Sequence, residues 1–145
     1  MKSQITVKRY PYEEPYHLQL EFFVSNGGFT GNTDFYCNAE DLKMIGQSLK
    51  NFPSNIDDEF RYEVGSENPE ERYYVYFLLR VYTIDSVGHC AIQFVINKNA
   101  VEPYEGSCRF SIRAGAASIN RLGVLFEKFS ELKDFEFEWS PELSE

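Results

Sequence analysis

Nucleophilic catalysis requires a serine or cysteine next to a base that is itself held in place by a third group. The chain has two histidines, His17 and His89. His89 precedes Cys90, but adjacent residues of a strand point to opposite faces of a sheet, so the two cannot form a dyad. Asp85 and His89 flank one predicted turn and can meet, with no evident nucleophile beside them. We therefore predict structural or surface roles for both histidines and no catalytic residue.

Metal binding and redox chemistry would need cysteines or histidines at ligand spacing. The three cysteines, Cys37, Cys90 and Cys108, are odd in number and share no C-x-x-C spacing, which argues against a disulfide framework and a zinc site. The acidic run at 57–59 lacks the spacing of a calcium-binding loop. Cys37 comes just before a predicted helix, a position that can lower a thiol pKa. We predict no metal site, and Cys37 is the one candidate for a reactive thiol.

Glycines at 27, 28 and 31 form the segment G-G-F-T-G-N between two predicted strands. A phosphate-binding loop or a dinucleotide fingerprint needs a strand–turn–helix context, which this segment lacks. Asn26, Gly27 and Gly28 instead favour a hairpin turn, because asparagine and glycine tolerate positive φ. We therefore predict no bound cofactor.

The net charge is −9, from 14 basic and 23 acidic residues, and acids concentrate at 57–71 and 127–145. Without a basic stripe, nucleic-acid binding is not expected. The acidic stretches either form ordinary solvated surface or create a negative electrostatic field that steers a basic protein partner. The first residues lack the apolar region of a signal peptide, and no apolar run approaches the roughly 20 residues that span a bilayer. We expect a cytoplasmic protein without membrane contact.

Alternating apolar residues predict most of the chain as strands, and two segments have helical periodicity. The first helix has Asn38 as its N-cap and ends at Pro53, and the second spans residues 116–132. The segment 73–85 is apolar on both faces, which is typical of a strand at the centre of a sheet. The predicted strands are residues 5–7, 17–25, 29–36, 59–64, 73–85, 89–97, 107–113 and 135–139.

This order of elements, β-β-β-α-β-β-β-β-α-β, contains no regular βαβ alternation. It predicts an α+β fold with a predominantly antiparallel sheet of about six to eight strands and two amphipathic helices packed on one face. The 145 residues fit one domain, 1–145. We expect Met1 to Lys2 and Pro141 to Glu145 to be disordered.

One face of the predicted central strand carries residues suited to protein binding. Aromatic residues make up 17% of the chain, and tyrosine and arginine are enriched at binding hot spots. The alternative is structural, with tyrosine rings covering the sheet and arginines paired to acids on neighbouring strands. The candidate protein-binding face consists of Tyr74, Tyr76, Arg80, Tyr82, Arg109 and Arg113.

Four segments together resemble a known family: GGFTGNTDFYC (27–37), AEDLKMIGQSLKNFP (39–53), LLRVYTIDSVGHCAIQFVI (78–96) and SCRFSIRAGAASINRLGVLF (107–126). They are similar to a family of small bacterial proteins, some of which are identified as immunity proteins of the WapI type that neutralise a partner toxin. None of the segments is a catalytic motif, so the resemblance transfers no site residue.

The resemblance implies a non-catalytic cytoplasmic interaction protein that neutralises a toxin by direct binding. The acidity of the chain suits a basic toxin domain as the partner. Two alternatives stay open: an enzyme with an unrecognised active site, and a regulatory module that senses a small molecule in a pocket between sheet and helices.

Overall fold

Two antiparallel sheets and two helices make up the fold in the computed structural model, which describes residues 2–15, 17–66, 68, 71 and 73–141. The first sheet has the order β3-β2-β1-β8, with β1 (Ser3–Tyr10), β2 (Leu18–Asn26), β3 (Thr30–Cys37) and β8 (Glu136–Trp139). The second sheet has the order β4-β5-β6-β7, with β4 (Glu59–Val64), β5 (Val75–Thr83), β6 (His89–Lys98) and β7 (Gly106–Gly115). The helices are α1 (Ala39–Lys50) and α2 (Ala116–Phe129).

The predicted order of elements and the antiparallel α+β class are confirmed. The expectation of one sheet of six to eight strands is wrong, because the eight described strands divide into two sheets of four. The chain leaves the first sheet through α1 and returns after α2, when β8 pairs with β1. An alternating pattern indicates which face of a strand is buried, but it does not determine which strands pair with it. The division into two sheets was therefore not visible in the sequence.

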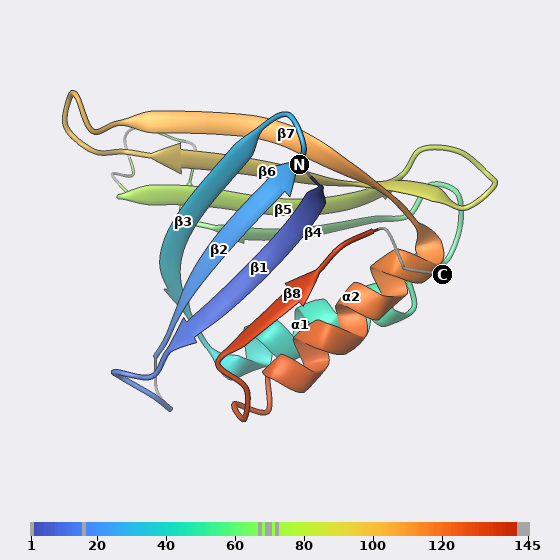
Figure 1. Ribbon diagram of the computed structural model, residues 1–145, viewed down its shortest axis with the longest axis horizontal. Coiled ribbons are helices and arrows are strands. Elements are labelled where there is room, and N and C mark those ends of the chain that lie inside the picture. The colour runs from blue at the N-terminus through green and yellow to red at the C-terminus, as the bar shows by residue number, and fades with distance from the viewer. Residues whose placement is uncertain (1, 16, 67, 69–70, 72, 142–145) are drawn as a thin grey trace.

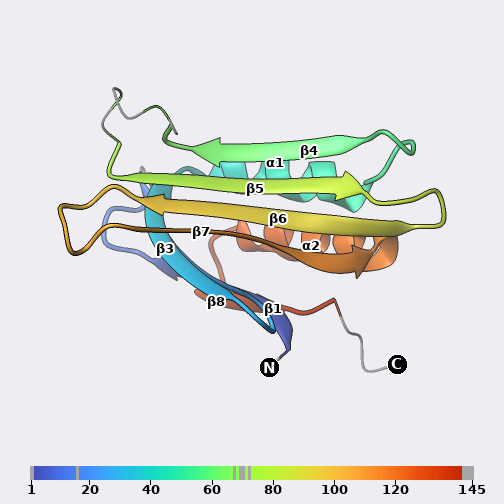
Figure 2. The same cartoon turned by 90° about the horizontal axis from the view of Figure 1, so that it is seen from above.

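One core joins both sheets and both helices. The strands of the first sheet run diagonally to those of the second (Figure 1), and both helices lie on the same side of the second sheet as the first sheet (Figure 2). Phe77 of the second sheet lies 4.8 Å from Phe22 and 4.9 Å from Phe35 of the first, measured between ring centroids. Phe22 also contacts Phe126 of α2, at 6.3 Å. The helices therefore leave the outer face of the second sheet uncovered.

The two helices touch each other through glycines. Gly46 of α1 and Gly123 of α2 are both buried, and a Cβ atom at Gly46 would lie 2.5 Å from the backbone nitrogen of Glu127. The Asn120 side chain donates to the carbonyls of Leu49 and Phe52, at 2.9 and 2.7 Å, and so satisfies the C-terminal end of α1. At its other end, α1 has the predicted N-cap, since Asn38 accepts from the backbone of its third helical residue.

The chain ends were expected to be disordered. Met1 and residues 142–145 lie outside the described residues, so that expectation stays a prediction for them. Lys2 is described and exposed, and the carbonyl of Pro141 accepts a hydrogen bond of 3.0 Å from Ser118 of α2. Among the described helices, none has the length and apolar character needed to cross a membrane.

Candidate interaction surfaces

His89 and Asp85 meet as the sequence suggested. Nδ1 of His89 lies 2.6 Å from Oδ2 of Asp85, and the other carboxylate oxygen accepts from the backbone nitrogens of Val87 and His89. These hydrogen bonds, led by that from the imidazole, hold the pKa of Asp85 below its usual value. The side chain of Cys90 is fully buried in the core on the opposite face. His17 is exposed and contacts Tyr36 edge-on.

Cys37 is a poor nucleophile despite its place before α1. Burial, with a smaller contribution from the Asp41 carboxylate, raises the pKa of its thiol to about 12. Desolvation of the thiolate is thus the largest cause of the raised pKa, although the residue lies next to a helix N-terminus. In the part of the chain that the structure describes, no three His, Cys, Asp or Glu side chains lie together as a metal site would require.

Alkylation of Cys37 by iodoacetamide is expected to be slow at about pH 8, because the thiolate is the nucleophile and this thiol stays protonated there. The rate should keep rising above about pH 9, where an ordinary thiol with a pKa near 8.5 approaches its plateau. Mass spectrometry of the Cys37 peptide measures the rate, with the urea-unfolded chain as the rapidly modified control. A plateau near pH 8 in the folded protein would contradict the raised pKa.

The register of the second sheet brings most of the predicted binding face together. Tyr76, Arg80 and Tyr82 alternate along β5, and the pairing through β6 places Arg109 and Arg113 of β7 on the same side. Three rows cross the outer face of the second sheet: Glu59, Tyr82, Ala91 and Arg113; Arg61, Arg80, Gln93 and Ser111; Glu63, Leu78, Val95 and Arg109.

Tyr74 does not join this face. It precedes β5, is 59% exposed, and its hydroxyl donates to the carbonyl of Asp34 in β3, at 3.4 Å. The predicted strand began at residue 73, two residues before the start of β5, and Tyr74 was therefore assigned to the alternating row. Tyr74 instead bridges the start of β5 to the first sheet.

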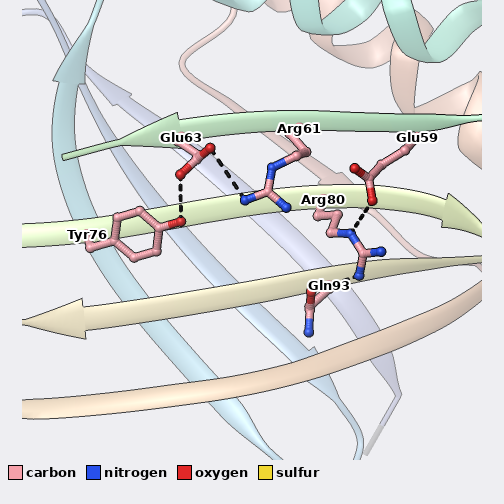
Figure 3. A network of polar contacts seen from close by, with 6 residues as sticks. All are labelled: Glu59, Arg61, Glu63, Tyr76, Arg80 and Gln93. Carbon is pink, nitrogen blue, oxygen red and sulfur yellow. Dashed lines mark hydrogen bonds and ion pairs between the residues drawn. The ribbon is translucent and has the colours of Figure 1, made fainter. Parts of the chain in front are cut away.

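Cross-strand contacts hold Tyr76 and Arg80 in place (Figure 3). The Tyr76 hydroxyl donates to Glu63 at 2.8 Å, and this tyrosine is only 1% exposed. Arg80 donates to Glu59 at 2.6 Å and to Gln93 at 3.2 Å. Its guanidinium also lies 4.1 Å from the ring centroid of Tyr82. For Tyr76 and Arg80 the contacts favour the structural alternative, in which these side chains tie β4, β5 and β6 together.

Arg109 and Arg113 are the accessible arginines of the predicted binding face. Both are exposed, and among the described residues neither has an ion-pair partner. The strand residues of the face comprise four arginines and two glutamates, a net charge of +2. An acidic protein therefore carries a locally basic sheet surface.

The outer face of the first sheet is a second surface, which the sequence analysis missed. The register aligns Glu136, Lys8, Glu21 and Asp34 in one row and Glu138, Thr6, Phe23 and Asn32 in the next. These two rows hold four carboxylates and one lysine, a net charge of −3. Phe23 is 45% exposed beside the acidic row, and Tyr36 of β3 is equally exposed.

One signal could have revealed the outer face of the first sheet. Phe22 and Phe23 are adjacent, so one of them must leave the buried face of the strand. Phe22 belongs to the core and Phe23 takes the outer side, in line with Glu21. The carboxylates of β8 join this face only through the pairing of β8 with β1, more than a hundred residues apart.

Comparisons with known proteins leave the family open. No family model matches the chain, and no curated protein matches it. Among solved structures, the chain is similar to the one described as "Structure of the plant transcriptional regulator PBF-2", with a TM-score of 0.49 and 13% sequence identity. That similarity covers 90% of this chain and 76% of the other.

Proposed function

We propose that the protein is a non-catalytic interaction protein of the immunity type, which neutralises a basic toxin domain in the bacterial cytoplasm by binding it. The observation that supports this most is the outer face of the first sheet. There, two adjacent rows hold four carboxylates, one lysine and the exposed Phe23. A basic partner surface complements that charge, and Phe23 offers an apolar anchor beside the acidic row.

Charge and aromatic contact contribute different things to such binding. The net charge of −9 draws a basic partner from a distance and raises the association rate. Once the partner is in place, desolvated aromatic side chains supply most of the affinity. Phe23 and Tyr36 are half-exposed on the acidic face, so their rings are available for that contact.

The outer face of the second sheet is proposed as a second contact. Arg109, Arg113 and the ring of Tyr82 are residue types found at binding hot spots. With its net charge of +2, this face would meet carboxylates of the partner. Tyr76 and Arg80 support the face from within, so we expect their substitution to act mainly on stability.

Phe23→Ala is expected to weaken partner binding by about tenfold or more, the effect of losing an aromatic hot spot. The tagged chain is used to capture its partner from the source cells, with the toxin gene expressed and the partner identified by mass spectrometry. Binding of the purified pair is then measured by calorimetry. Because Phe23 is exposed, the thermal midpoint should change little.

Val124→Ala is the matched control, since Val124 is an exposed apolar residue on α2 and lies outside both sheet faces. It should leave the affinity unchanged. Recovery of no stable partner in several growth states would overturn the proposed function. A captured partner that binds Phe23→Ala as tightly as the natural chain would instead remove the first sheet as the contact surface.

A further inference from the structure

A polar groove lies where the end of β7 meets the start of β1 and the turn between β2 and β3. Its volume is about 430 Å³, and its lining includes Ser3, Asn26, His89, Ser111 and Arg113. Small-molecule sites have volumes of about 300–1,000 Å³ and place a few polar groups around the ligand. The groove is therefore large enough for a small polar ligand.

Among the residues that the structure describes, those that line the groove include one arginine and no carboxylate. Arg113 has no ion-pair partner among the described residues, although the chain has 23 acidic residues. Its planar guanidinium suits bidentate binding of an oxyanion. An anionic ligand would thus supply the partner that the protein does not give to Arg113.

His89 lines the groove, and its ring is held by Asp85, which lies outside the groove lining. Its Nδ1 faces Asp85 at 2.6 Å, and Asp85 is itself held by two backbone N–H groups. Nε2 is therefore the ring nitrogen left for a ligand. A phosphate group can satisfy Nε2 in either charge state of the ring, because phosphate offers both acceptor oxygens and, near neutral pH, an O–H donor.

Hydroxyl groups complete the polar lining. Ser111 contributes its side chain from the same row of the sheet as Arg80 and Gln93, while its carbonyl accepts from Asn26 at 3.1 Å. That hydrogen bond ties the β2–β3 turn to β7, and both of its residues line the groove. Ser111 and Ser3 can each donate an O–H to a phosphate oxygen.

We propose that this groove binds the phosphate group of a small molecule, with Arg113 as the main anion-binding residue and His89, oriented by Asp85, as the second. The inference does not rest on the proposed function, because it concerns the purified protein alone. It assigns a role to the paired Asp85 and His89, which the interaction surfaces leave unused.

Titration of the full-length ¹⁵N-labelled protein with inorganic phosphate and with glucose 6-phosphate tests the proposal. We expect saturable shifts of amide signals near His89, Ser111 and Arg113. Arg113→Gln should weaken binding by about tenfold, the effect of one lost charge-assisted contact. Asp85→Asn should weaken it less, because His89 loses only its orienting partner. Tighter binding of glucose 6-phosphate would identify the ligand as an organic phosphate, and tighter binding of the free ion would identify it as phosphate itself.

Arg109→Gln is the matched control. Arg109 lies on the same strand and the same face, is exposed and has no ion-pair partner among the described residues, but it does not line the groove. It should change phosphate affinity by less than about twofold, the size of a screened surface effect. Equal losses for Arg109→Gln and Arg113→Gln would show general electrostatic attraction and overturn the site. Absence of saturation, or shifts confined to other parts of the chain, would overturn it as well.

Discussion

Gly46→Ala is expected to lower the free energy of unfolding by about 2–3 kcal/mol, at the upper end of the usual cost of overpacking. A Cβ at this position would lie 2.5 Å from the nitrogen and 2.8 Å from the Cα of Glu127, and 2.8 Å from the carbonyl oxygen of Gly123. All three are backbone atoms of α2, so no side chain can rotate away. The helices must separate, and the buried residues between them and the sheets lose contact. The midpoint of thermal unfolding should fall by about 5–10 °C.

Gly106→Ala is the control for Gly46→Ala. A Cβ at Gly106 would meet no atom within 4 Å, so this substitution should leave the thermal midpoint nearly unchanged. Gly123→Ala should behave like Gly46→Ala, because its Cβ would lie 2.5 Å from the nitrogen of Lys50. Stability is measured by urea and thermal unfolding followed by circular dichroism. Equal midpoints for Gly46→Ala and Gly106→Ala would show that the helix contact tolerates a methyl group.

Local patterns predicted the elements well because each pattern depends on residues close in sequence. The alternation of Leu18, Leu20, Phe22 and Val24 identified the buried face of β2. The N-cap at Asn38 followed from capping chemistry, and the predicted end of the helix at Pro53 lies three residues beyond its observed end at Lys50. The division into two sheets depends instead on which strands pair, and the pairing of β8 with β1 has no local signal.

The candidate surface was predicted in part, for the same reason. Strand periodicity placed Tyr76, Arg80, Arg109 and Arg113 on one face, and the register agrees. Periodicity could not predict that Arg80 would contact Glu59 of β4 and that Tyr76 would contact Glu63. Such a prediction requires knowing which strand pairs with β5 and in which register. The charge of each face is likewise a property of pairing: only the assembled sheets show a net charge of +2 on one outer face and −3 on the other.

Arg9→Met is expected to lower the free energy of unfolding by about 3–5 kcal/mol, the cost of breaking a buried ion pair by removing one partner. The Arg9 side chain is 2% exposed, forms an ion pair with Glu14, and donates from Nε and Nη2 to the carbonyl of Asp134 at 3.2 and 2.9 Å. The guanidinium also lies 4.5 Å from the ring centroid of Phe135. The Arg9 side chain extends from β1 and thus contacts both the segment that follows β1 and the segment that precedes β8.

Removing Arg9 is costly because the buried Glu14 carboxyl group would lose its ion-pair partner. Among the described residues, its second carboxylate oxygen has no hydrogen-bond partner, so the whole group would stay desolvated and unsatisfied. Arg9→Met combined with Glu14→Gln should therefore recover part of the stability lost, as measured by urea unfolding. Lys8→Met is the control, because Lys8 and Glu136 form an exposed pair at 3.8 Å, worth less than about 1 kcal/mol. If Arg9→Met costs no more than Lys8→Met, then the register of β8 is held by its backbone pairing and the core residue Trp139 alone.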